Sequence, residues 1–399
     1  MSGRGVFLAL VAAGLIAGCG GAGPATEDGA SLRSEAAQVP TQAALPPAIP
    51  AGNGPGTTVG EPIREEGAAV LPMEPQGRHV EPLVAYGDKI LVKSIDGNAA
   101  PGSAPFEYFT WDPATGRADP AWTGEPGGQD FVSGAEGPWV ATVRTGMELP
   151  FPDWKLILRN LETGEVREIA ESVEGLGEED ALEPLLPTGF APYPAISGGR
   201  VAWIEGSRNA AGQTVRRVQV YSIETNESRT LAETVAGEGD SWGVALGGSV
   251  AAWAFRDDKG GKSGIRVMHL GSGEARDVVE SDAVFSLALS GDGTHLAWDE
   301  GMTAKFALDL ATGERVQYAG AIGWGATASG DYVSWIPATG RGGRAGFYSF
   351  STGEVRFRED IPGAMMNLAQ VMGPWFVWQE RPLDPALAGR YYFMRLAGS

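Results

Sequence analysis

Leu289-Ser-Gly-Asp-Gly-Thr-His-Leu-Ala-Trp298 lies at the centre of the repeat that decides the fold of this 399-residue chain. The apolar run 283–289 has the length of a buried strand, and the Gly-Asp-Gly turn after it is of the kind that closes a hairpin. The second strand of the hairpin ends at Trp298, and the alternating segment 305–310 predicts a third strand. The segment 315–318, which follows a Thr-Gly-Glu turn, predicts a fourth strand. Four antiparallel strands in a unit of this size are typical of one blade of a β-propeller.

The second strand of this unit is repeated along the chain as a turn glycine followed, five residues later, by tryptophan. Self-similarity at a period of 37 to 61 residues indicates stacked blades or a solenoid. The tryptophan copies end at Trp203, Trp253, Trp298, Trp335 and Trp378, and two looser copies end at Val92 and Thr142.

The turn between the third and fourth strands recurs in phase with the first turn. It reads Thr-Gly-Glu or a close variant, and Asn226 replaces the glycine once, because asparagine also tolerates a positive φ. We therefore predict an all-β protein, a seven-bladed β-propeller with four antiparallel strands per blade. Six blades are the alternative if one looser copy is not a blade, and a β-sandwich or unrelated tandem β units would also contain repeated strands. The six copies of this turn are 115–117, 163–165, 225–227, 272–274, 312–314 and 352–354.

The seventh unit has sequence for only three strands, near 367–371, 375–378 and 391–396, before the sequence stops at Ser399. An open edge would expose unpaired backbone groups. We expect the stretch 62–73 to pair beside the third of these strands and close the ring.

The Leu289–Trp298 segment resembles the Ser-Pro-Asp-Gly, apolar-Ala-aromatic signature of TolB-like and WD40-like bacterial propeller repeats. Propellers of the prolyl oligopeptidase class carry similar repeats, and the Thr-Gly-Glu turns resemble pyrroloquinoline-quinone-type repeats without the tryptophan that usually follows. The resemblance covers residues 80–397 and implies the fold alone, because the residues of the motif form turns and the buried core. In contrast to TolB, we expect no α/β domain ahead of the repeats, and in contrast to the peptidases, we expect no hydrolase domain after them.

The N-terminus resembles a bacterial lipoprotein signal. Arg4 precedes an apolar run, 6–17, that is too short to span a bilayer, and Leu15-Ile-Ala-Gly-Cys19 resembles a lipobox. The resemblance implies lipid attachment at Cys19, the only cysteine, on the outer face of the cytoplasmic membrane or in the outer membrane of the cell envelope. An ordinary signal peptide with a coincidental cysteine is the alternative.

Three regions follow from this division. Residues 1–18 form the signal peptide, and 19–60 form a flexible tether rich in Gly, Ala and Pro that cannot bury enough apolar surface to fold. The propeller domain occupies 61–399.

The amino-acid composition limits the kinds of partner and cofactor that we expect the protein to bind. Fifty acidic and 30 basic residues give a formal net charge of −20, which argues against nucleic acid and against an anionic membrane surface, so anchorage depends on the lipid. Only three histidines occur, and they are scattered, so we expect no metal and no other cofactor. The chain has no Gly-x-Ser-x-Gly elbow between a predicted strand and a helix, and we expect no catalytic serine.

The predicted insertions indicate the binding face. In a propeller the first-to-second and third-to-fourth turns share one face, whereas the second-to-third loops and the crossings between blades share the other. The insertions fall in the second set, which usually marks the binding face. Six residues ahead of each turn glycine, the innermost strands should begin at the channel mouth of that face. These positions hold Glu81, Phe131, Pro192, Trp242, Trp324 and Asn367, with Phe285 equivalent in the blade that has a longer turn.

Aromatic residues at a channel mouth can stack on a sugar ring or on apolar side chains, although they also serve to pack neighbouring blades. We expect a monomeric, lipid-anchored binding or scaffold module that presents its loop-rich face to an envelope protein, peptide or glycan. The alternative is an extracytoplasmic polysaccharide hydrolase or lyase. It would use a pair of carboxylates, for which the mouth offers Glu81 and Asp130.

Overall fold

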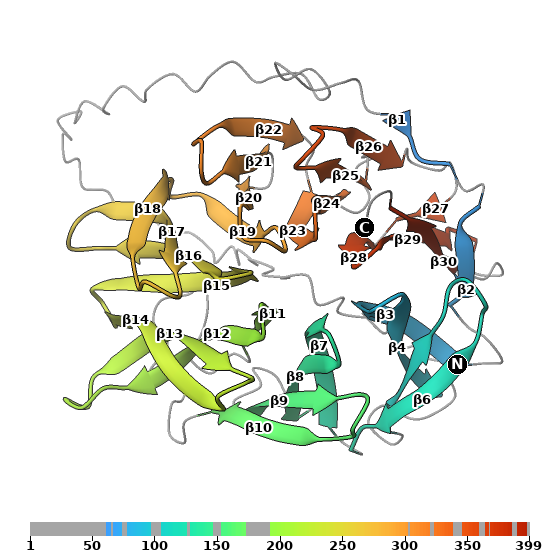
Figure 1. Cartoon of the computed structure of the whole chain (residues 1–399), viewed down its shortest axis with the longest axis horizontal. Coiled ribbons are helices and arrows are strands. Elements are labelled where there is room, and N and C mark those ends of the chain that lie inside the picture. The colour runs from blue at the N-terminus through green and yellow to red at the C-terminus, as the bar shows by residue number, and fades with distance from the viewer. Residues whose placement is uncertain are drawn as a thin grey trace, which may run out of the picture.

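Seven sheets surround a central axis in the computed structural model of the chain (Figure 1). The structure describes residues 61–64, 67–73, 78–96, 105–125, 128–146, 153–172, 192–301, 304–319, 323–337, 345–358, 364–366, 368–384 and 389–396. The expected signal peptide and tether, including Cys19, lie outside these residues. The described part is all-β, and the prediction of a seven-bladed propeller is confirmed.

Each blade consists of four antiparallel strands that run in order from the channel to the rim. Blade 1 comprises β3 (Arg78–Tyr86), β4 (Lys89–Asp96), β5 (Glu107–Trp111) and β6 (Ala118–Thr123). Blade 2 comprises β7 (Gly128–Glu136), β8 (Trp139–Gly146), β9 (Trp154–Asn160) and β10 (Val166–Glu171). Blade 3 comprises β11 (Ala195–Ser197), β12 (Arg200–Arg208), β13 (Thr214–Ser222) and β14 (Glu227–Val235). Blade 4 comprises β15 (Gly239–Gly247), β16 (Val250–Asp257), β17 (Lys262–His269) and β18 (Ala275–Glu280). Blade 5 comprises β19 (Val284–Leu289), β20 (His295–Glu300), β21 (Ala304–Asp309) and β22 (Arg315–Ala319). Blade 6 comprises β23 (Gly323–Ser329), β24 (Tyr332–Pro337), β25 (Ala345–Ser349) and β26 (Val355–Arg358). Blade 7 comprises β28 (Ala369–Met372), β29 (Trp375–Pro382), β30 (Arg390–Arg395) and β2 (Ala69–Pro72), and β27 (Ala364–Met365) also pairs with β29.

The repeated tryptophans form the core of the blades. All five lie on the second strand and are at most 3% exposed, and Val92 and Thr142 at the equivalent positions of blades 1 and 2 are completely buried. Each tryptophan belongs to a buried cluster that also contains residues of the preceding blade, so its side chain fills the space between those two sheets. The repeat is therefore a packing motif.

The N-terminal segment closes the ring, as predicted. Strand β2 pairs antiparallel with β30 as the outer strand of blade 7, with Val70 opposite Tyr392 and Leu71 opposite Tyr391. The sequence did not predict that β1 (Glu61–Pro62) would add a fifth, parallel strand to blade 6 beside β26. Figure 1 shows both N-terminal strands at the rim of these last two blades.

The turns between first and second strands define one face of the propeller, here named the turn face. Their glycines adopt positive φ, and in blades 3 to 5 they also approach one another across the blade boundaries. A Cβ at Gly198 (φ 60°) would lie 2.2 Å from the carbonyl oxygen of Gly248, and a Cβ at Gly293 would lie 2.3 Å from that of Gly247. These turns therefore need glycine both for the backbone conformation and for close contact between blades.

Replacing Gly198 with alanine tests this double requirement. We expect Gly198→Ala to lower the free energy of unfolding by about 2–4 kcal/mol, because strain at positive φ adds to the clash with the next blade. Gly212→Ala is the matched control, since Gly212 has φ 75° but no atom within 4 Å of the added Cβ. Its cost is expected to be only about 1–2 kcal/mol in urea-induced unfolding. Equal losses for the two variants would show that the contact between turns does not matter.

Deletion of 61–73 tests the closure. The segment contributes Ile63, Leu71 and Met73 to the core, so its loss is expected to lower the melting temperature by about 10 °C or more. A deletion of equal length within the expected tether, 45–57, is the control and should leave the melting temperature unchanged. An unaltered melting temperature after loss of 61–73 would refute the donated strand.

Candidate functional site

The candidate mouth residues lie inside the innermost strands and not at their beginnings. Glu81, Phe131 and Trp242 are each the fourth residue of their strand, while Phe285 and Trp324 are each the second. The expectation that these strands begin at the candidate residues was wrong because the pairing with the second strands continues further toward the crossings. Two further candidates are placed differently: Pro192 is buried ahead of β11, and Asn367 lies outside the described residues.

A ring of β-bulges lies directly beside these candidates. The register between first and second strands shifts at one level in five blades, for example between Pro82 and Val84 and between Trp242 and Val244. The other three shifts lie in blades 2, 5 and 6. Bulges bend a strand and redirect its side chains, and they are frequent next to functional sites. The structure thus brings Glu81, Phe131, Trp242, Phe285 and the backbone of Trp324 to a common level around the channel.

Trp242 links two blades at this level. Its indole Nε1 donates a hydrogen bond to the carbonyl oxygen of Val284 in blade 5 (3.1 Å), and the ring packs against a buried cluster that includes Ala254 and Leu287. Phe131 packs against a buried cluster that spans blades 2 and 3 and includes Trp154 and Trp203. These two aromatic residues therefore pack blades together, which was the alternative role considered for them.

Glu81 is engaged by a cation on the neighbouring strand. It lies directly opposite Lys93, and the carboxylate Oε2 is 2.7 Å from Nζ, with about a quarter of each side chain exposed. Burial raises the pKa of Tyr391, and the negative charge of Glu81 adds to this effect. The Glu81 carboxylate is thus an ion-pair partner at the edge of the channel.

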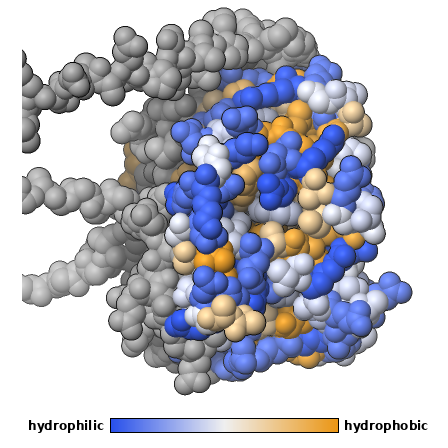
Figure 2. Space-filling view, turned by 90° about the vertical axis from the view of Figure 1, so that its left-hand side faces the viewer, coloured by the Kyte–Doolittle hydropathy of each residue, from blue (hydrophilic) through white to orange (hydrophobic). Residues whose placement is uncertain are grey.

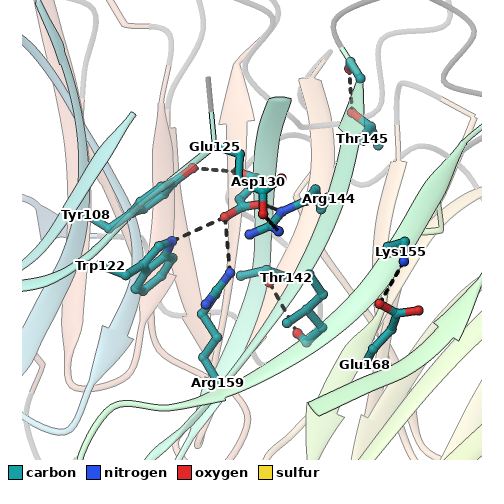
Figure 3. A network of polar contacts seen from close by, with 12 residues as sticks. Tyr108, Trp122, Glu125, Asp130, Thr142, Arg144, Thr145, Lys155, Arg159 and Glu168 are labelled. Atoms are coloured by element: carbon teal, nitrogen blue, oxygen red, sulfur yellow. Dashed lines mark hydrogen bonds and ion pairs between the residues drawn. The ribbon is translucent and has the colours of Figure 1, made fainter. Parts of the chain in front are cut away.

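Asp130 is held by a network between blades 1 and 2 (Figure 3). Its side chain is 2% exposed, and it accepts hydrogen bonds from Arg144 Nε (2.9 Å) and from Trp122 Nε1 (3.2 Å). Arg159 approaches the same carboxylate to 3.8 Å, and Arg144 also binds the exposed Glu125 at 2.6 Å. Two guanidinium groups and an indole N–H surround this carboxylate, so its oxygens act as hydrogen-bond acceptors and ion-pair partners.

Aromatic contacts complete the network. Tyr108 stacks on Trp122 with ring centroids 4.2 Å apart, and its hydroxyl donates to the backbone oxygen of Asp130 at 3.1 Å. Burial raises the pKa of Tyr108 and, for Arg159, lowers the pKa of the guanidinium. The pKa of Arg144 is raised: burial lowers it, but the hydrogen bond and charge of Asp130 outweigh that effect. The network is therefore a buried ion-pair cluster that joins the first two blades.

The same arrangement occurs between blades 3 and 4. Asp240 on β15 binds Arg216 on β13 at 2.7 Å, with both side chains almost fully buried. Burial raises the pKa of Asp240 despite the attraction of Arg216. A third buried pair, Asp299 with Lys305 at 2.9 Å, lies within blade 5.

Arg144, Arg159, Trp122 and Arg216 were not identified from the sequence. Hairpin symmetry could have found one of them, because Asp130 and Arg144 are equidistant from the turn glycine Gly137 and lie opposite each other. The other three belong to a third strand, a fourth strand or a neighbouring blade, and no local pattern marks them.

The described surface contains few exposed apolar residues. Val70, Val166, Tyr193 and Leu383 are the exposed large apolar residues of the described part; Val166 lies in blade 2, Tyr193 in the crossing to blade 3, and Val70 and Leu383 on different strands or loops of blade 7. Figure 2 shows apolar residues as separate groups bordered by hydrophilic ones. The predicted insertions are 95–105, 144–153, 206–215, 256–264, 337–343 and 379–390, with the crossing 171–193, and all except 206–215 and 256–264 include residues outside the described ranges.

A metal site and a membrane-spanning helix are both absent from the described ranges. No group of three or more His, Cys, Asp or Glu side chains could hold a metal ion. No helix there is long and apolar enough to cross a membrane.

Comparison with known proteins identifies the fold. No protein-family model matches the chain, and no curated protein matches it. Among solved structures, the propeller domain of the Trilobed protease from Pyrococcus furiosus is 10% identical, with a TM-score of 0.50 over 81% of this chain and 94% of that chain. A prolyl endopeptidase is 10% identical, with a TM-score of 0.53 over 81% of this chain and 51% of that chain. TolB from Acinetobacter baumannii is 11% identical, with a TM-score of 0.39 over 80% of each chain. The propeller fold implied by the TolB-like repeats is confirmed, and identities of this size show the fold alone.

Asp130→Asn tests the ion-pair cluster. The change removes the buried negative charge that faces both guanidinium groups and leaves Arg144 only the exposed Glu125, so the free energy of unfolding is expected to fall by about 3–5 kcal/mol. Glu125→Gln is the matched control, because Glu125 pairs with the same Arg144 but is largely exposed, and it should cost less than about 1 kcal/mol. If Asp130→Asn unfolds at the same urea concentration as the unaltered protein, the cluster does not hold blades 1 and 2 together.

Proposed function

We propose that this propeller is a lipid-anchored, extracytoplasmic binding or scaffold module that presents its loop-rich face to an envelope protein, peptide or glycan. The main support for the proposal is that both carboxylates predicted at the channel mouth are bound by other side chains. Glu81 is paired with Lys93, and Asp130 is surrounded by two guanidinium groups and an indole. A glycosidase needs a pair of carboxyl groups that face the substrate, whereas these two carboxylates are already engaged by cationic side chains.

This arrangement weighs against the alternative of a polysaccharide hydrolase or lyase that would use Glu81 and Asp130. The rigid seven-bladed body supports a display role, because loops on a rigid scaffold bind without much loss of conformational entropy. Candidate contact residues at the mouth are Glu81, Phe131, Trp242, Phe285, Trp324 and Asn367.

Site-specific photo-crosslinking in the native host tests which face binds. The loop face is the loop-rich face opposite the turn face. A photoreactive phenylalanine in place of Lys259, in the exposed β16–β17 connection of the loop face, is expected to form a discrete adduct with an envelope component. The same group at Thr312, in the exposed β21–β22 turn of blade 5 on the turn face, is the control and should form none. An adduct from Thr312 alone would place binding on the turn face and contradict the proposal.

Cys19→Ala tests the anchor. Stable anchoring requires more than one acyl chain, which the modified cysteine would carry, so the variant should move from the membrane fraction to the soluble fraction. Mass spectrometry of the unaltered protein should find a lipid-modified Cys19 at the mature N-terminus. Membrane association that survives the substitution would exclude lipid anchoring at this residue.

A further inference from the structure

Blade 3 contains a depression on the turn face that no other part of the proposed function uses. It has a volume of about 290 Å³, close to the lower end for small-molecule sites, and lies at the boundary with blade 4. Arg200 at the start of β12, Arg229 on β14 and Glu227 line it, together with the hydroxyl groups of Ser222, Thr225 and Ser228.

Strand register places the two arginines on one face of the sheet. Arg200 lies opposite Ser222, and Val220, two residues earlier on β13, lies opposite Arg229. Both side chains therefore point toward blade 4, where Arg229 donates a hydrogen bond to the carbonyl oxygen of Leu270.

The equivalent positions in the two preceding blades hold complementary groups. In blade 1, Lys89 at the start of the second strand pairs with Asp119 on the fourth strand at 2.9 Å. In blade 2, the guanidinium of Arg167 stacks over the Trp139 ring, 4.5 Å from its centroid. Blade 3 instead has a second cation where these blades have an anion or an aromatic ring.

The two arginines of blade 3 have no acidic partner among the described residues. Arg200 donates to the backbone oxygen of Gly198 at 2.8 Å, and no ion pair joins Glu227 to either guanidinium in the described part of the chain. Arg200 and Arg229 lie on the same face of the sheet on either side of β13, and two like charges on one face repel each other unless an anion lies between them. In a chain with a net charge of −20, two adjacent arginines left without a carboxylate are ready to bind an external one.

We propose that this depression binds a carboxylate-bearing ligand, either a uronic acid residue of a glycan or a peptide carboxylate. The guanidinium group matches a carboxylate in a bidentate geometry, and the hydroxyl groups around it can bind the neighbouring polar atoms of the ligand. Two arginines and Glu227 give the lining a formal charge of +1, which suits a monoanion better than a dianion such as phosphate.

Isothermal titration of the full-length protein in detergent tests the site with four probes: glucuronate, an acetylated dipeptide with a free C-terminus, inorganic phosphate and glucose. We expect saturable, salt-sensitive binding of glucuronate or of the dipeptide, and the better of these two probes identifies the source of the carboxylate. Glucose should not bind, and phosphate should bind more weakly than the better carboxylate. Equal or tighter binding of phosphate would overturn the assignment to a monoanion, and no binding of either carboxylate at 100-fold excess would overturn the site.

Arg200→Gln and Arg229→Gln should each weaken binding of the carboxylate at least tenfold. Arg276→Gln is the matched control, because Arg276 on β18 donates to the backbone oxygen of Leu310 in blade 5 as Arg229 does to Leu270 in blade 4. It removes an equivalent contact between blades and one charge, but it does not line the depression. The same loss of binding in Arg276→Gln would show that general charge or stability is responsible, and the proposal would be wrong.

Discussion

The pairing of β2 with β30 is the interaction on which the rest of the propeller depends. The last blade obtains its outer strand from the far end of the sequence, where residues 69–72 supply it. Leu71 and Met73 then enter one apolar cluster with Val80 of blade 1 and Phe393 of blade 7. The same segment therefore completes the hydrogen bonds of the last sheet and packs the boundary between the last blade and the first.

Three kinds of contact hold neighbouring blades together elsewhere. Turn glycines approach the backbone of the next turn, as Gly198 approaches Gly248. Arginines on the fourth strands of blades 2 to 4 donate to a backbone oxygen of the next blade, with Arg167 binding Ile223 at 2.8 Å. Buried polar contacts, such as the ion pair of Asp240 in blade 4 with Arg216 in blade 3, lie toward the opposite face. Glycine contacts and arginine contacts lie on the turn face, whereas the ion pairs lie near the bulge ring.

The sequence predicted the features that repeat. The glycine turns and the second-strand tryptophans follow from local turn chemistry and from burial between sheets, and the unmatched edge of blade 7 followed from counting strands. The parallel pairing of β1 with β26 could not be predicted, because it involves two residues and no repeat. Two partners of Asp130 could also not be predicted from the sequence, because Trp122 and Arg159 reach it from the fourth strand of blade 1 and the third strand of blade 2. Ligand contacts by Phe131 and Trp242 stay predictions, since both residues also pack blades together.

The two faces of the propeller have different physical character. The turn face is closely packed around glycine and bears the arginine-lined depression of blade 3, whereas the bulge ring, its ion pairs and the connections between blades lie toward the loop face. The assignment of features to a turn face and a loop face requires a closed ring of blades. Hydrogen exchange measured by mass spectrometry tests this closure most directly. Among residues 69–71, the backbone amides that face β30 are predicted to be protected as strongly as those of β30, their partner strand; Pro72 has no amide hydrogen. Exchange of these amides within seconds, while β30 stays protected, would contradict closure by the N-terminal strand.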